Sequence, residues 1–188
     1  MSFNRIASCA YLSVIFISVA MLMIMTGCTP DIVMKATEPG SGSSNQGGDG
    51  IVLQLPFAAG VEKQCTQGTF GTFSHSSDST KFDIDLDTVN SSDEEIYAPI
   101  GGTAYVHMDS ATSGFGYHVN IDVGSNQYAV VAHFSAIFIA DGPEVSVGQL
   151  IGYAGSTGNC SVDHVHVGLH EGSAAPDAAQ GHSIAVNA

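Results

Sequence analysis

The segment DHVHVGLH, residues 163–170, carries a dense group of side chains that could do chemistry. In an extended strand, residues two apart project from the same face, so His164 and His166 would lie side by side. Val165 and Val167 would face the opposite, buried side. Two neighbouring imidazoles can bind a metal ion or transfer protons near neutral pH. The same pair is also compatible with a harmless exposed strand, so other residues must decide its role.

Further histidines and acidic residues could complete a site around this pair. His133 ends a run that begins at Tyr128, and His75 precedes the acidic stretch KFDIDLD. A catalytic zinc ion takes three protein ligands and keeps one position for water. Two histidines with one carboxylate, or three histidines, would meet that requirement without a cysteine. Each of these histidines, taken alone, is equally compatible with a structural or surface role.

Four stretches resemble, in order, the lysostaphin-type (LytM-like) zinc endopeptidases of bacterial cell walls. That family has a His followed by an Asp, then an isolated His on a later strand, then an H-x-H motif. The matching stretches are His75 with the IDL strand, APIGGTAYV, YAVVAHFSAI and PEVSVGQLIGYAGSTGNCSVDHVHVGLH. The last is the most specific, because its glycines, its spacing and its two histidines all agree with the family pattern. The resemblance covers about residues 68–171.

The resemblance implies a role for each matching histidine. His75 and His166 fall on zinc ligands of the family. His133 and His164 fall on its two catalytic histidines, which do not bind the metal. Zn²⁺ is the implied cofactor.

The third ligand implied by the resemblance is an aspartate, and two candidates compete. Asp83 and Asp85 lie two residues apart and would project from the same face of a strand. We assign Asp85, because it leaves the shorter insertion before residues 96–98, which resemble the family's next segment; Asp83 is the alternative. Gly168 stands where the family often has Glu, and His170 continues the same strand face.

By the same resemblance, the chain would be a zinc-dependent endopeptidase that hydrolyses peptide bonds in bacterial cell-wall peptidoglycan. The alternative is a non-catalytic LytM-like domain that binds the wall or activates another hydrolase. Such relatives typically lack zinc ligands, whereas the required residue types are present here. A peptidase that acts on other proteins is a third hypothesis, since substrate pockets lie in the loops. The sequence does not indicate an oligomeric state.

The elements that would position these residues are short. Runs rich in Val, Ile, Tyr and Thr alternate with Gly, Asn and Ser turn clusters, which predicts an all-β fold. We expect a single antiparallel sandwich or barrel-like domain over residues 51–172, and no stretch of it has helical periodicity over ten residues. The clearest hairpin joins His118–Val123 to Tyr128–His133. A second hairpin is expected around Gly148.

The N-terminal region has the pattern of an envelope lipoprotein. Residues 1–27 have the order of a secretory signal peptide, with an apolar run of about 15 residues, short of the ~20 that span a bilayer. The sequence before Cys28 resembles a lipobox, so we expect this cysteine to be lipidated and to tether the chain to a membrane. Thr29, and not an aspartate, follows Cys28. By resemblance to Gram-negative lipoproteins, this indicates sorting to the periplasmic side of the outer membrane, if the organism has an outer membrane. Residues 28–50 are expected to be a flexible linker and residues 173–188 a disordered tail.

The net charge of the chain excludes one class of partner. The chain after Cys28 has 18 acidic residues and three lysines, so its net charge is 3 − 18 = −15. This argues against nucleic acid as a partner, because nucleic-acid binding needs clustered Lys and Arg.

Cys65 and Cys160 are the two cysteines in the expected domain. Two cysteines in an oxidising compartment predict a disulfide between them.

Overall fold

The computed structural model describes residues 33–36, 51–88, 93–108, 110–175 and 180–186, which contain β-strands and no helix. The predicted all-β antiparallel class is therefore confirmed. None of these residues forms a helix long and apolar enough to cross a membrane. The predicted signal peptide and Cys28 lie outside the described residues. The strands are β1 (Val33–Lys35), β2 (Glu62–Gln67), β3 (Ile84–Asp87), β4 (Glu95–Tyr97), β5 (Gly102–His107), β6 (His118–Gly124), β7 (Gln127–Ala132), β8 (Phe134–Ile137), β9 (Glu144–Val145), β10 (Leu150–Ala154), β11 (His164–Glu171) and β12 (His182–Ile184).

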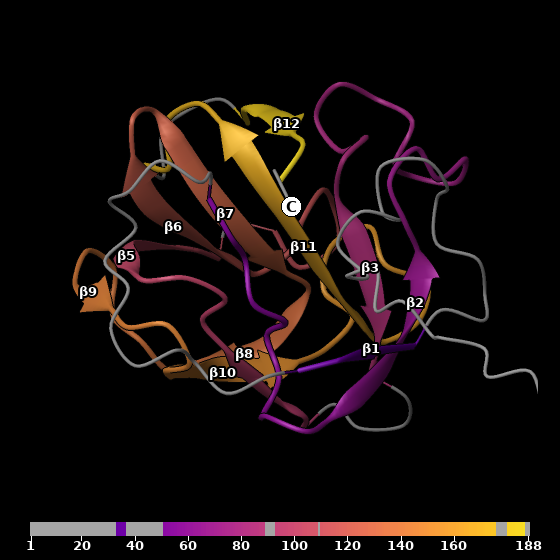
Figure 1. Ribbon diagram of the computed structural model, residues 1–188, viewed down its shortest axis with the longest axis horizontal. Helices are drawn as coiled ribbons and strands as arrows, with labels where there is room; N and C mark the ends of the chain where they lie inside the picture. Colours follow the sequence, from indigo (N-terminus) through magenta and orange to yellow (C-terminus); the bar gives the residue numbers. More distant parts are fainter. Residues whose placement is uncertain (1–32, 37–50, 89–92, 109, 176–179, 187–188) are drawn as a thin grey trace, which may run out of the picture.

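Two antiparallel sheets build the domain (Figure 1). The large sheet has the order β1-β2-β3-β11-β7-β6-β5-β9, and β12 also pairs with β11. The small sheet has the order β4-β10-β8. Val131 and Val165 of the large sheet and Ile151 of the small sheet belong to one buried cluster. Burial of such side chains stabilises the fold by about 1.5–3 kcal/mol each, so it determines which face of each strand points inward.

Alternate side chains of β11 point to the core and to the candidate site. Val165 and Val167 belong to the core cluster, and His164 and His166 project from the other face, as a strand requires. On β3, which pairs with β11, Asp85 lies opposite His166 in the register. The sheet thus places a carboxylate and an imidazole from distant parts of the chain side by side.

The predicted hairpin between residues 118 and 133 is confirmed, since β6 pairs with β7. Its turn has Ser125 at φ 54° and Asn126 at φ 60°, the pair of left-handed residues found in two-residue type I′ turns. The hairpin expected around Gly148 is wrong. Gly148 does turn the chain at φ 75°, but β9 joins the large sheet while β10 joins the small one.

The structure differs from the sequence-based expectation at both ends of the domain. The expected tail contains β12, which pairs with residues 169–171 of β11. β3 pairs with residues 164–167 of β11. Beyond the end of β3, β12 provides the hydrogen-bond partners for the backbone groups of β11. The expected linker contains β1, which pairs with β2 at the edge of the large sheet. Neither strand was expected, because the linker and tail segments that contain them are rich in small and polar residues.

The predicted Cys65–Cys160 disulfide is wrong, because Cys160 is a free thiol. Cys65 lies opposite Leu86 in the register and is completely buried in the core cluster. Cys160 lies on the side of β11 that carries the histidines, where its Sγ is 3.1 Å from His164 Nδ1. A disulfide needs two Cβ atoms about 4 Å apart, and Cys160 is not part of the core cluster that contains Cys65. Burial raises the pKa of the Cys160 thiol to about 11.

Candidate active site

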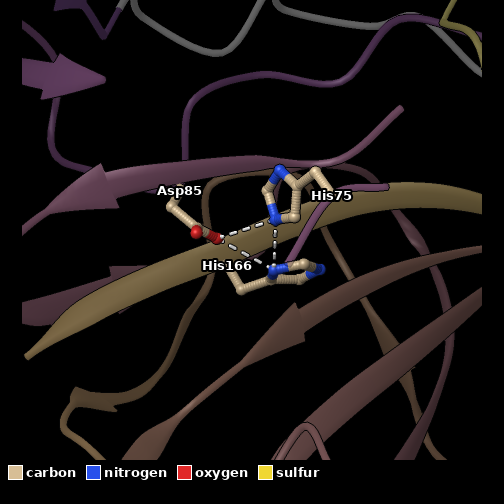
Figure 2. A group of neighbouring side chains, drawn as sticks. All are labelled: His75, Asp85 and His166. Carbon is tan, nitrogen blue, oxygen red and sulfur yellow. Dashed lines mark hydrogen bonds and ion pairs between the residues drawn. The ribbon is translucent and has the colours of Figure 1, made fainter. Parts of the chain in front are cut away.

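His75, Asp85 and His166 converge at one point over the large sheet (Figure 2). His75 Nε2 lies 3.3 Å from His166 Nδ1 and 3.3 Å from Asp85 Oδ1. His166 Nδ1 lies 2.9 Å from Asp85 Oδ1. All three residues are buried. They come from the loop before β3, from β3 and from β11, so the fold assembles the cluster from separate elements.

The loop between β2 and β3 orients His75. Its Nδ1 lies 3.1 Å from the backbone oxygen of Gly68. A carbonyl oxygen only accepts hydrogen bonds, so Nδ1 carries the proton and Nε2 turns its lone pair toward the cluster.

Gln67 forms hydrogen bonds both to Asp85 and to the loop that carries His75. Its side-chain amide donates to Asp85 Oδ2 at 3.0 Å, and its Oε1 accepts from the backbone N–H of Ser74 at 3.2 Å. This leaves Asp85 Oδ1 for the cluster. Sequence reasoning missed Gln67, because a glutamine at the end of β2 belongs to no motif and only the strand pairing brings it near Asp85.

His166 lies between two carboxylates. Its Nδ1 faces Asp85, and its Nε2 lies 2.9 Å from Oδ2 of Asp83, which is the alternative aspartate from the sequence. Burial alone would lower the pKa of His166, but the hydrogen bonds to Asp83 and Asp85 outweigh burial and raise it to about 9. Burial likewise opposes ionisation of Asp85, yet its hydrogen bonds with His166 and His75 hold its pKa below the usual range.

The donor set of the cluster fits a zinc ion. When His166 is neutral, two imidazole lone pairs and one carboxylate oxygen face one another, and their repulsion requires either a proton or a cation among them. Two nitrogens and one oxygen from His and Asp are a set that catalytic zinc takes, with a further position open to water. Asp83 touches His166 on its other nitrogen and lies outside this cluster.

His133 and His164 lie beside the cluster with their ring centroids 4.5 Å apart. Both donate Nδ1–H to a backbone oxygen: His133 to Thr157 at 2.8 Å and His164 to Val162 at 2.9 Å. Each therefore keeps an unprotonated Nε2 when neutral. Burial and the nearby histidines lower the pKa of His133 to about 3, so this ring stays neutral at physiological pH.

The backbone at His133 is in the left-handed region, with φ 69°. This conformation is uncommon for a residue other than glycine and costs on the order of 1 kcal/mol. It occurs where β7 ends and β8 begins, so the turn aims the His133 ring toward His164 while Phe134 enters the core.

These side chains line an open cleft. Asp85, His133, His164 and His166 line it together with Phe115, whose ring centroid is 4.9 Å from that of His166. Hydroxyl and amide groups contribute the remaining polar surface, from Ser74, Ser77, Ser79, Thr80, Asn159, Ser161 and Gln180. A cluster suited to a metal, with two further histidines beside it in an open polar cleft, can support hydrolysis of an extended substrate.

Solved structures share this fold. The catalytic domain of a mutant of EnpA, a prophage-encoded M23 protein from Enterococcus faecalis, matches with a TM-score of 0.51 and 25% identity, over 70% of this chain and 94% of that one. A putative M23 peptidase from Pseudomonas aeruginosa matches with a TM-score of 0.50 and 20% identity, over 76% of this chain and 53% of that one. No curated protein matches the chain.

The family match covers the larger part of the site. The model of Peptidase family M23 matches residues 83–178, which contain Asp85, His133, His164 and His166. His75 lies before this match and enters the cluster through the loop that precedes β3. Because the matched residues make up just over half of the 188, the chain belongs to Peptidase family M23.

Proposed function

We propose that this protein is a zinc-dependent endopeptidase that hydrolyses peptide bonds in bacterial peptidoglycan. The observation that carries the proposal is the convergence of His75, Asp85 and His166 at the edge of an open cleft, which Asp85 and His166 line together with His133 and His164. Membership of Peptidase family M23 and the resemblance to lysostaphin-type enzymes of cell walls support it.

The proposed chemistry assigns distinct tasks to the five residues. His75, Asp85 and His166 would hold Zn²⁺. A bound zinc ion acidifies water and polarises a carbonyl oxygen. His133, neutral at physiological pH, offers Nε2 to accept a proton or to orient the attacking water. His164 Nε2 lies 3.7 Å from Asp85 Oδ1, and once this nitrogen has taken up a proton it would stabilise the developing oxyanion or protonate the leaving amine.

The cleft suits a peptide that carries little charge of its own. Its lining includes hydroxyl and amide groups from the loop at residues 74–80 and from residues 159–161, and such groups exchange hydrogen bonds with a peptide backbone. The cleft is open to solvent, which supports an extended peptide as substrate, such as the stem or cross-bridge peptides of peptidoglycan.

We also propose that lipidation of Cys28 tethers the enzyme to a membrane of the cell envelope. The lipobox-like sequence before Cys28 supports this, because acyl chains on a cysteine anchor a chain to a membrane without a spanning helix. Metabolic labelling with a radioactive fatty acid tests it. Label is expected in the wild type and not in Cys28→Ala, and an unlabelled wild-type protein contradicts the anchor.

Digestion of purified peptidoglycan tests the activity itself. Zinc-loaded protein is expected to release fragments whose new amino termini, identified by mass spectrometry, lie at one type of peptide bond. His133→Ala and His164→Ala should release none while still binding zinc. Cleavage of unfolded proteins but not of peptidoglycan would contradict the proposed substrate. Stoichiometric zinc with no cleavage of either would favour a non-catalytic, wall-binding domain.

A further inference from the structure

Asp83 lies completely buried next to the candidate metal cluster. Its Oδ2 lies 2.9 Å from His166 Nε2 and 3.1 Å from His170 Nε2, and its Oδ1 lies 3.2 Å from His170 Nε2. Both imidazoles come from β11, four residues apart on one strand face. Asp83 thus touches a residue of the cluster from the side opposite to His75 and Asp85.

The carboxylate determines which nitrogen of His166 faces the cluster. An ionised carboxylate only accepts hydrogen bonds, so in the zinc-free protein His166 donates Nε2–H to Asp83 and Nδ1–H to Asp85, each at 2.9 Å. Because Asp83 keeps the proton on Nε2, Nδ1 is the nitrogen that would give up its proton to a metal ion. We propose that Asp83 is a positioning residue that holds His166 in the ring orientation and tautomer that present Nδ1 to a metal ion. This role rests on the zinc centre of the proposed function. Partners of this kind raise the affinity of a site by keeping a ligand ready for the metal.

His170 in turn fixes the Asp83 carboxylate. The side chain of His170 is completely buried, and its Nε2 lies within hydrogen-bond distance of both carboxylate oxygens. Among the described residues, His170 Nδ1 has no hydrogen-bond partner, so the ring makes its hydrogen bonds through Nε2, as the donor to Asp83. The ring is packed between Tyr128, at a centroid distance of 5.3 Å, and Phe115, at 5.9 Å. A carboxylate held by two donors cannot rotate away from His166.

The strand is built to admit this carboxylate. Gly168 lies between His166 and His170 on the same face of β11, and a Cβ at this position would overlap the Asp83 carboxylate. Glycine inside a strand weakens it and is typical of a close approach by another group. Asp83 and Gly168 therefore form a matched pair, in which the missing side chain at 168 makes room for the positioning group.

Two competing roles predict different behaviour. If Asp83 were itself a metal ligand, its loss would abolish stoichiometric binding, as the loss of Asp85 should. If Asp83 only stabilised the fold, restoring the stability of a variant would restore its zinc affinity. A positioning role predicts weakened binding at one zinc per chain that persists when stability is restored.

The test uses the full chain with Asp83→Ala, with Asp85→Ala and with the double variant Asp83→Ala/Gly168→Ala. In the double variant, the methyl group at 168 occupies space that the carboxylate leaves. Asp122→Ala is the matched control, because Asp122 lies on β6, two strands away from β11. Zinc affinity is measured by chelator competition, stability of the zinc-free protein by urea unfolding, and the Nε2 proton of His166 by NMR with ¹⁵N-labelled histidine.

Asp83→Ala is expected to bind one zinc with about 10–100-fold weaker affinity, the usual effect of removing a partner of a metal-bound histidine. The double variant should regain stability and stay equally weak, and Asp122→Ala should match the wild type. A double variant that recovers both stability and affinity overturns the proposal. The proposal is also overturned if Asp83→Ala loses stoichiometric zinc while Asp85→Ala retains it, because Asp83 would then be the ligand.

The NMR signal separates this proposal from the proposed function. An exchange-protected His166 Nε2 proton is expected in the wild type and should be lost in Asp83→Ala. This result can be obtained even if the wild type cleaves no peptidoglycan or binds no zinc, outcomes that would count against the proposed function. Absence of the protected proton from the wild type overturns the positioning role by itself.

Discussion

His75 Nε2 lies 3.3 Å from His166 Nδ1, although 91 residues separate the two in the chain. Each nitrogen faces the other because the opposite nitrogen of its ring is engaged: His75 Nδ1 with the Gly68 carbonyl and His166 Nε2 with the Asp83 carboxylate. Nε2 of His75 and Nδ1 of His166 are thus directed at one point by hydrogen bonds made behind the rings. This arrangement separates the residues that would hold a metal from those that would act on a substrate.

Single substitutions should separate these two groups. His75→Ala and His166→Ala are each expected to abolish stoichiometric zinc, because two remaining ligands hold the ion poorly. His133→Ala and His164→Ala should retain one zinc per chain and lose activity by at least about 100-fold, the scale of general acid–base catalysis. Elemental analysis of dialysed protein, combined with peptidoglycan digestion, measures both. Loss of zinc from His133→Ala would mean that this residue is a ligand.

Zinc affinity should depend on pH. In the zinc-free protein, the pKa of His166 is raised to about 9 by Asp83 and Asp85, so zinc must displace a proton from Nδ1 at lower pH. The association constant is therefore expected to rise about tenfold per pH unit between pH 7 and pH 9 and then to level off. Chelator competition across this range measures it. A constant affinity between pH 7 and pH 9 would show that His166 carries no such proton.

The stability of the zinc-free protein should fall as the pH rises. The folded pKa of His166, about 9, lies above its unfolded value near 6.5, so the charged ring stabilises the fold fully below pH 6.5. This contribution, on the order of 2–3 kcal/mol for so buried a group, is lost as the pH rises through 9. Urea unfolding at pH 6 and pH 9.5, with chelator present, measures the difference. His166→Ala is the control and should show a markedly smaller pH dependence.

The C-terminal strand should stabilise the loop that carries His75. Ser183 of β12 is buried; its Oγ accepts from the backbone N–H of Phe82 at 3.1 Å, and its backbone N–H donates to the Asp78 oxygen at 2.9 Å. Ser183→Ala would leave the Phe82 N–H unpaired and is expected to lower the free energy of unfolding by about 1–3 kcal/mol. Ser76→Ala, in the exposed part of the loop, should change it by less than about 0.5 kcal/mol. Equal effects of the two substitutions would argue against this anchoring.

The fold class and the placement of the histidine pair could be predicted from the sequence. Strand periodicity alone places His164 and His166 on one face and the flanking valines in the core, because burial of Val165 and Val167 leaves no alternative. Turn chemistry likewise indicates the hairpin at Ser125 and Asn126.

The remaining features depend on long-range pairing, which local patterns do not contain. Gln67 meets Asp85 only because β2 pairs with β3. Counting cysteines predicts a Cys65–Cys160 bridge, but pairing of β2 with β3 buries Cys65 in the core cluster, whereas Cys160 is a free thiol beside His164. The position of Asp83 could have been inferred from Gly168, since a glycine in the middle of a strand indicates a close approach. β12 gave no signal, because a short strand that completes an edge needs no apolar pattern of its own.

The central claim is that this chain cleaves peptidoglycan peptides through a zinc ion held by His75, Asp85 and His166. Its most direct test is to strip the purified protein of metal with a chelator, add back one equivalent of zinc, and follow the release of new amino termini from peptidoglycan. We expect no release from the stripped protein, restored release with zinc, and none at any zinc level from Asp85→Ala. Release that is undiminished after stripping, or that persists in Asp85→Ala, would contradict the account.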